Sequence, residues 1–356
     1  MHLTIITSTP QNVSLGSGTY VAATSLQQGL ERLGHRVRMV CPRRAPGAFG
    51  HTLQRFTFNL SLSPDRAGGG MVVGFDMDGF TLSGHIHPFA CYVHGTLADE
   101  ATFERGGTAQ LLKLQARAER RSARHADLVL TTSEYSAGRI AHFYVVSQDR
   151  IGIVPPAFDV INWQSELESA VRNGAGASHP TVLCVARMYP RKNIRSLIAA
   201  TRLLVDTGQQ LAVRIVGDGP ERRQLERMTH GLELTNIVTF AGQVSHDRLV
   251  AEFATCDVFC LPSLQEGFGI VYLQAMASGR PVVGLRASST PELVEHGVNG
   301  LLAHPHDDAD LADALRRLLD DEALRIAMGA VNPQKAREFD VLSTTRRLLD
   351  LLASVS

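Results

Sequence analysis

Two cations, Arg187 and Lys192, lie five residues apart, directly after an apolar run at residues 181–186 that is typical of a buried strand. In open α/β sheets, ligands bind beyond the carboxyl ends of the strands. A guanidinium and an ammonium at such a strand end can converge on one diphosphate. The pair therefore predicts a phosphate site, with a solvated surface pair as the alternative.

A second group of residues that could bind a ligand lies at residues 266–280, EGFGIVYLQAMASGR. Gly267 and Gly269 precede a helical pattern, and the free N–H groups at a helix start attract anions, which glycine allows to approach closely. The carboxylate of Glu266 and the amide of Gln274 suit hydroxyl groups better than phosphate. A nucleotide-sugar, with a diphosphate flanked by polyols, matches this combination. A helix with turn glycines and no ligand is the alternative.

This stretch resembles the signature of the retaining glycosyltransferases of family 4, which have the GT-B fold. That signature runs Ser, Glu-Gly-Phe-Gly, a second Glu eight residues after the first, and Ala-Met-Ala-x-Gly-x-Pro-Val-Val. The matching residues are Ser263, Glu266, Gly267, Phe268, Gly269, Ala275, Met276, Ala277, Gly279, Pro281, Val282 and Val283. Gln274 replaces the second Glu, and Ser288-Ser289 replaces a glycine pair that the family usually has.

The resemblance implies a role for each candidate residue. Arg187 and Lys192 would hold the phosphates, Glu266 would meet the donor sugar, and Gln274 would face the ribose hydroxyls. The implied catalytic residues are His94, Glu266, Arg187 and Lys192. The implied donor-binding residues are Gly16, Gly18, Arg187, Lys192, Gly242, Glu266, Gly267, Phe268, Gly269 and Gln274.

The start of the chain predicts a β-loop-α-β unit with a glycine-rich turn. Residues 2–8 read as a strand, and Gly16 and Gly18 lead into a helix at residues 19–33. A dinucleotide fingerprint fails because Val21 occupies its third glycine position. A tight turn without a ligand fits the residues equally well, whereas the resemblance implies a loop near the donor phosphates.

His94 follows an apolar run at residues 89–93, so we expect it at the carboxyl end of a strand. A lone histidine there is more often structural. The resemblance implies that it lies against the donor sugar, because the family has a strand that ends in Val-His.

Three patterns resemble metal-binding sites only superficially. Asp76 and Asp78 form an Asp-x-Asp pair after a strand, but far upstream of the donor signature, so we interpret them as a polar rim. His85 and His87 lie two residues apart in a turn. The five cysteines have no zinc spacing and resemble reduced core residues. We therefore expect no metal and no cofactor.

The helix predicted at residues 111–126 carries five cations on one face: Lys113, Arg117, Arg120, Arg121 and Arg124. A solvated basic face is one interpretation. Attraction to an anionic membrane or to a phosphorylated acceptor is the other. Because the chain shows no signal peptide and no apolar run of about 18 residues, we expect a cytoplasmic protein, with peripheral contact at the inner membrane surface left open.

Strands alternate with helices twice over, and Pro155-Pro156 separates the two series. This pattern predicts an α/β protein of two Rossmann-like domains with parallel sheets, which the resemblance places facing across a cleft. We expect an N-terminal acceptor-side domain at residues 1–156 and a donor domain at 157–338. A tail helix at 339–356 would return to the first domain.

The predicted reaction is metal-independent transfer of a sugar from a nucleotide-sugar to an acceptor hydroxyl, with retention. We expect a UDP-sugar in preference to a GDP-sugar, and a carbohydrate or lipid-linked acceptor. Zero formal net charge gives no indication of nucleic-acid binding. The alternatives are a nucleotide-sugar sensor, an inactive partner subunit, or another GT-B enzyme such as a nucleotide-sugar epimerase.

Overall fold

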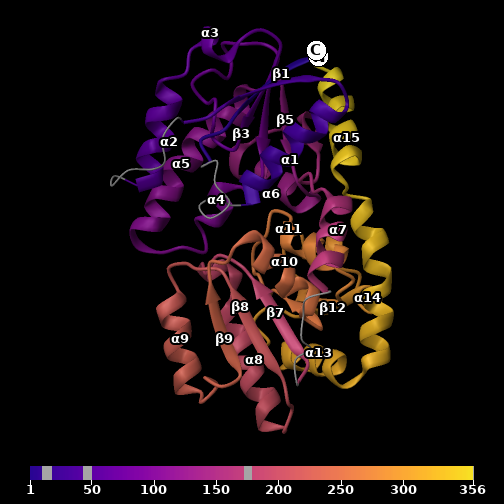
Figure 1. The fold of residues 1–356 in the computed structure, drawn as a ribbon. Coiled ribbons are helices and arrows are strands. Elements are labelled where there is room, and N and C mark those ends of the chain that lie inside the picture. The colour runs from indigo at the N-terminus through magenta and orange to yellow at the C-terminus, as the bar shows by residue number, and fades with distance from the viewer. Residues whose placement is uncertain (10–17, 43–49, 172–178, 356) are drawn as a thin grey trace. The chain divides into compact units, whose positions relative to one another are not determined.

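The computed structural model describes residues 1–9, 18–42, 50–171 and 179–355. These residues form two compact units (Figure 1). Unit 1 comprises Met1–Phe158 and Phe339–Ser356, and unit 2 comprises Asp159–Glu338. Each unit is an α/β layer structure around its own sheet.

Unit 1 contains a six-stranded parallel sheet with the strand order β2-β1-β3-β4-β5-β6. Its strands are β1 (His2–Ile6), β2 (Arg36–Val40), β3 (Met71–Phe75), β4 (Phe89–Val93), β5 (Leu128–Thr131) and β6 (Ile151–Ile153). Its helices are α1 (Gly18–Arg32), α2 (Gly50–Leu60), α3 (Pro64–Ala67), α4 (Leu97–Glu100), α5 (Gly106–His125), α6 (Glu134–Tyr144), α15 (Val341–Ala353) and the 3-10 turn η1 (Gln148–Arg150).

Helices cover both faces of this sheet, which explains why β3 and β4 are buried at every residue. One core joins Leu26 of α1 and Leu348 of α15 to the inward side chains of β1, β3 and β4. The other joins Phe58 of α2 and Ile140 of α6 to the opposite face. A continuous apolar run in the sequence is therefore the expected pattern for these central strands.

The C-terminal helix α15 packs on α1 at Gly29. A Cβ atom at this glycine would lie 2.2 Å from the hydroxyl oxygen of Thr345, so only a residue without a side chain lets the two helices approach this closely. Val341, Leu348 and Leu352 of α15 belong to the same core as β1. Helix α15 is thus part of the hydrophobic core of unit 1.

Unit 2 contains a second six-stranded parallel sheet, with the strand order β12-β11-β10-β7-β8-β9. Its strands are β7 (Thr181–Val185), β8 (Ala212–Val216), β9 (Val238–Gly242), β10 (Val258–Cys260), β11 (Val282–Leu285) and β12 (Gly300–Ala303). Its helices are α7 (Val160–Val171), α8 (Ile194–Asp206), α9 (Arg222–Gly231), α10 (His246–Thr255), α11 (Ile270–Ala277), α12 (Thr290–Leu293), α13 (Asp308–Asp320), α14 (Glu322–Arg337) and the 3-10 turn η2 (Pro190–Lys192).

The structure confirms the predicted α/β class with two parallel, Rossmann-like sheets and a C-terminal helix on the first of them. It adds the helix α2 at Gly50–Leu60, for which the sequence analysis predicted no element. Leu53 and Leu60 share one face of α2 and are exposed, whereas the helix buries Phe58 on another face. The helical spacing of the apolar residues therefore does not mark the buried face of α2.

Candidate functional site

The strand order of unit 2 identifies where a ligand would bind. Numbered within the unit, the order is 3-2-1-4-5-6, the order of a dinucleotide-binding sheet. In such sheets the crevice lies beyond the carboxyl ends of the first and fourth strands, where the direction of winding reverses. In this chain those strands are β7 and β10, and they are hydrogen-bonded neighbours.

The segment after β7 carries both predicted phosphate ligands. The guanidinium of Arg187 is exposed and lies 5.7 Å from the ring centre of Tyr189. Within the described part of the chain, Arg187 has no ion-pair partner, so its charge is available to a ligand. Lys192 ends η2, directly before α8, and its side chain is 15% exposed.

The segment after β10 brings Glu266 to Lys192. The ammonium of Lys192 donates to Oε1 of Glu266 at 2.6 Å, and the hydroxyl of Ser263 donates to the same oxygen at 2.9 Å. The amide of Leu264 also donates to the carbonyl of Arg191 at 2.8 Å, which ties the two segments together. The structure therefore joins the predicted phosphate ligand and the predicted sugar ligand in one cluster.

Oxygen Oε2 of Glu266 is different, because it has no hydrogen-bond or ion-pair partner among the described residues. The Glu266 side chain is only 8% exposed. Oε2 is not among the fully buried atoms that lack a partner, so it keeps some access to solvent. Oε2 is thus suited to accept a hydrogen bond from a ligand hydroxyl.

Helix α11 begins beside this cluster. Gly269 caps it with φ +90, and a Cβ atom there would lie 2.5 Å from the ring of Tyr272, so the position requires glycine for two independent reasons. Gly267 and Phe268 lie in the same segment between Glu266 and the helix. The backbone therefore requires glycine at position 269, and the anion site at the helix start stays a prediction.

Gln274 lies inside α11 and is 7% exposed. Its side-chain amide has no hydrogen-bond partner among the residues that the structure describes. A buried amide carries both donors and acceptors that need partners. Its position is consistent with the predicted ribose contact.

Gly242 ends β9, two strands away from β7 in the sheet. Its φ is +69, and its carbonyl accepts a hydrogen bond from the amide of Gly217 at 2.8 Å. Gly242 therefore lies at the same edge as the Lys192–Glu266 cluster. Its predicted contact with a nucleobase stays a prediction.

The thiols near this edge do not contribute a nucleophile. Burial raises the pKa of the Cys184 thiol, which lies in β7, to about 12. A thiol with this pKa stays protonated at neutral pH, and the thiolate is the reactive form.

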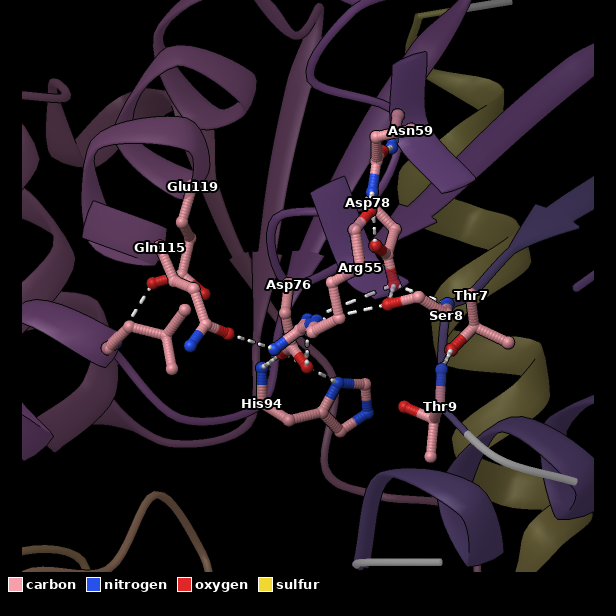
Figure 2. A network of polar contacts seen from close by, with 12 residues as sticks. Thr7, Ser8, Thr9, Arg55, Asn59, Asp76, Asp78, His94, Gln115 and Glu119 are labelled. Carbon is pink, nitrogen blue, oxygen red and sulfur yellow. Dashed lines mark hydrogen bonds and ion pairs between the residues drawn. The ribbon is translucent and has the colours of Figure 1, made fainter. Parts of the chain in front are cut away.

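In unit 1, His94 lies directly after β4, as predicted (Figure 2). Its amide donates to a carboxylate oxygen of Asp76 at 2.9 Å, and its ring nitrogen Nδ1 is 3.7 Å from that oxygen. The imidazole stacks on Phe75, with ring centres 4.8 Å apart, and lies 4.2 Å from the ring centre of Tyr92. Its position is thus defined by one carboxylate and two aromatic rings.

Asp78 connects the ends of β1 and β3, where the winding of this sheet reverses. The amide and the hydroxyl of Ser8 donate to one oxygen of Asp78, at 2.5 and 2.7 Å, and Asn59 donates to the other at 2.8 Å (Figure 2). Burial raises the pKa of the Asp78 carboxyl, and these hydrogen bonds and Arg55 only partly oppose that effect. Both carboxylate oxygens of Asp78 are thus used within the protein.

Arg55 is a site residue that the sequence analysis did not identify. It reaches from α2 to the same strand ends, where it donates to Ser8 at 3.0 Å and to Gln115 at 3.0 Å. Its guanidinium also lies within 4 Å of Asp76 and Asp78, at 3.9 and 3.8 Å. A single arginine among apolar residues, far from the other members in sequence, gave no signal of this role.

The remaining predicted residues are distributed as follows. Gly18 is the first residue of α1, whereas Gly16 lies outside the described residues. His87 binds Asp127 at 2.8 Å. Within residues 1–9, 18–42, 50–171 and 179–355, no cluster of three or more His, Cys, Asp or Glu side chains is arranged to hold a metal ion.

Helix α5 presents the predicted basic face. Its cations Lys113, Arg117, Arg120, Arg121 and Arg124 are all exposed, together with Leu111 and Leu114. None of the described helices combines the length and the apolar character that crossing a lipid bilayer requires. The surface of α5 thus combines positive charge with exposed leucines.

Comparison with known proteins identifies a family that matches part of this chain. Residues 167–335 match the family Glycosyl transferases group 1. The chain is 33% identical over 224 residues to the GDP-mannose-dependent alpha-(1-6)-phosphatidylinositol monomannoside mannosyltransferase of Mycobacterium tuberculosis. The aligned segment covers 59% of this chain and 57% of that protein. The matched segment thus spans little more than half the length of that relative.

Solved structures extend the likeness to the whole chain. Sucrose-phosphate synthase from Thermosynechococcus elongatus has a TM-score of 0.83 at 20% identity, covering 99% of this chain and 98% of that one. HepE of Anabaena, solved in complex with UDP and glucose, has a TM-score of 0.75 at 20% identity, covering 99% and 100%. At this identity the likeness shows the fold, which is the GT-B fold built from two Rossmann-like units.

Proposed function

We propose that this chain, which belongs to the glycosyl transferases group 1 family through residues 167–335, transfers a sugar from a nucleotide-sugar donor to an acceptor hydroxyl. The observation that carries the proposal is the cluster at the reversal point of the second sheet. There Arg187 is available to an anion, and Lys192 lies 2.6 Å from a Glu266 carboxylate with one unpartnered oxygen. A diphosphate and a sugar hydroxyl are the ligand groups that suit this cluster.

The chemistry follows from the charges. Transfer breaks the bond between the anomeric carbon and the diphosphate oxygen, and the electron pair stays on the departing diphosphate. Arg187, Lys192 and the start of α11 stabilise that growing negative charge. The acceptor oxygen bonds to the anomeric carbon, and its proton passes to the departing phosphate. If the acceptor arrives on the face that the phosphate leaves, the configuration is retained.

No metal ion is needed for this scheme, because two side-chain cations already face the leaving group. We assign Glu266 to the donor sugar and Gln274 to the ribose, and the unpartnered Oε2 and the unpartnered buried amide support both assignments. His94 is assigned to the reaction by resemblance. Its defined orientation on Asp76 supports that role.

The nucleobase of the donor and the identity of the acceptor both need an experiment. The mycobacterial relative is named for GDP-mannose and HepE was solved with UDP, so both bases belong in the test, with a UDP-sugar as our expectation. The relative's name includes a phosphatidylinositol monomannoside, which supports a carbohydrate or lipid-linked acceptor.

Thermal unfolding in the presence of UDP-, GDP- and ADP-sugars tests donor binding. We expect one nucleotide class to raise the melting temperature. Release of nucleoside diphosphate from that donor, without added acceptor, then separates a catalyst from a sensor or an inactive subunit. Chromatography of the sugar product separates transfer or hydrolysis from epimerisation. No stabilisation by any of the donors would contradict the proposal.

We also propose that α5 attaches the protein peripherally to anionic lipid. Each exposed cation near an anionic membrane contributes about 1 kcal/mol, and Leu111 and Leu114 can insert among the headgroups. Flotation with vesicles of phosphatidylglycerol should recover the protein, and vesicles of phosphatidylcholine should not. Equal recovery with both kinds of vesicle, or no recovery with either, would contradict this attachment.

A further inference from the structure

Ser288 and Ser289 follow β11, in the segment where the resembling family usually has two glycines. Ser288 has φ +50, in the left-handed region that favours glycine. A non-glycine residue stays in this region only where surrounding contacts hold it. The contacts of the two hydroxyl groups therefore indicate why serine is tolerated here.

Both hydroxyls bind the backbone of Glu266. The Glu266 amide donates to Oγ of Ser288 at 3.0 Å, and Oγ of Ser289 donates to the Glu266 carbonyl at 3.1 Å. Ser289 is fully buried. Two glycines would offer neither hydroxyl, so this pair of hydrogen bonds depends on the serines.

The Glu266 side chain is fixed at the other end. Ser263 and Lys192 both donate to Oε1, so this oxygen is fully engaged. With the backbone held on both sides and Oε1 held by two donors, the direction of Oε2 is determined by the protein before any ligand arrives.

We infer that Ser288 and Ser289 are positioning residues that orient the free oxygen of Glu266 toward a hydroxyl of the donor sugar. The inference rests on the proposed function, because it assigns Glu266 to that sugar. It predicts that the two hydroxyls affect recognition of the sugar but not of the nucleotide, whose ligands are Arg187 and Lys192.

The test compares a nucleotide-sugar with the bare nucleotide by calorimetric titration, using UDP-glucose against UDP and GDP-mannose against GDP. The variants are Ser288→Gly and Ser289→Ala. We expect each to weaken sugar-nucleotide binding about three- to tenfold, the effect of one hydrogen bond, and to leave binding of the bare nucleotide unchanged. Ser288→Asn tolerates the left-handed region and keeps a side-chain acceptor, so it should restore part of the loss.

A matched control is His306→Gly, which replaces an exposed residue with φ +65 in the same unit. Like Ser288→Gly, it relieves a left-handed φ angle, but it should not alter either affinity. Melting temperatures of all variants identify any that fold poorly, and Ser288→Gly should not lower its value because glycine favours this φ angle.

The outcomes separate the two proposals. If the wild-type protein binds neither nucleotide-sugars nor bare nucleotides, the proposed function fails and this inference fails with it. If the wild-type protein binds them and the serine variants lose equal affinity for sugar-nucleotide and bare nucleotide, or lose none, only the positioning role is wrong.

Discussion

Asp76 and Asp78 lie two residues apart after the same strand, and the protein shifts the pKa values of their carboxyl groups in opposite directions. Burial is the largest influence on both and would raise both. At Asp76 the hydrogen bonds and charge of His94, together with the Arg55 charge, outweigh burial and lower the pKa. At Asp78 burial prevails over Arg55, Ser8 and Asn59, and the pKa is raised.

This contrast predicts that pH affects the stability of two variants differently. Above the ordinary Asp pKa of 3.8, the unfolded chain releases the Asp78 proton first, which favours unfolding. The stability advantage of the wild type over Asp78→Asn should therefore fall as pH rises above 3.8, by up to about 1.4 kcal/mol per pH unit until the raised folded pKa is passed. Urea unfolding of both proteins between pH 4 and 7 measures this.

Asp76→Asn is the matched control. The stability that Asp76 contributes is present above 3.8 and is lost only as pH falls through its lowered folded pKa. Its cost, about 1–3 kcal/mol for a lost buried charged acceptor, should stay constant between pH 5 and 7. A constant difference for Asp78→Asn between pH 4 and 7, or a falling one for Asp76→Asn between pH 5 and 7, would contradict the assignment of the two carboxyl groups.

Removal of either proposed phosphate ligand should weaken binding of a nucleoside diphosphate. We expect Arg187→Ala and Lys192→Ala each to cost about 1.5–3 kcal/mol, the contribution of a hydrogen bond to a charged group. Only Lys192→Ala should also lower the melting temperature, because it leaves the Glu266 carboxylate, 8% exposed, without its cation. Calorimetry with unchanged affinity in both variants would remove Arg187 and Lys192 from the phosphate site.

The sequence could predict Arg187, Lys192 and Glu266 because ligand-binding residues in this fold class follow the carboxyl ends of strands. Parallel strands end at one edge, so cations after one apolar run and a carboxylate after another lie at the same edge of the sheet. The contact between Lys192 and Glu266, 74 residues apart, was not predicted in detail. Residue types and spacing indicate which strand end a side chain follows, but only the order of strands in the sheet shows which ends are neighbours.

The polar network of unit 1 was less predictable. Asp76 and Asp78 were interpreted as a polar rim, and the structure shows them bound to His94, Ser8 and Asn59. Arg55 and its helix α2 were missed, because the spacing of the apolar residues does not mark the buried face of α2. The hydrogen-bond partners of Arg55 are also 47 and 60 residues away in the sequence. Contacts of that range leave no local pattern.

Turnover should survive removal of divalent metal. In the proposed function, Arg187 and Lys192 supply the positive charge for the leaving diphosphate, so activity measured in EDTA should stay within about twofold of the untreated rate. That change is far less than the tenfold that about 1.4 kcal/mol would produce. Complete loss in EDTA, restored by manganese or magnesium, would instead assign a metal to the reaction and return attention to Asp76 and Asp78.

Gln274 stands where the resembling family has a glutamate, which makes it a direct test of the ribose assignment. Gln274→Glu should tighten donor binding, because an ionised carboxylate accepts hydrogen bonds from hydroxyls more strongly than an amide does. Without donor it should lower the melting temperature, since the position is 7% exposed and its side chain has no partner among the described residues. The change should appear mainly in the donor KM, because ribose contacts alter little as the anomeric bond breaks.

Gln274→Leu distinguishes the ribose contact from a structural role. If the amide binds the ribose, leucine leaves hydroxyls unpaired in the site and weakens donor binding by about 1–3 kcal/mol. If the amide only faces the protein interior, leucine leaves donor binding intact and raises the melting temperature, because an unpartnered amide is replaced by an apolar side chain. Donor affinity and melting temperature measured on both variants decide between these outcomes, and we expect the loss of affinity.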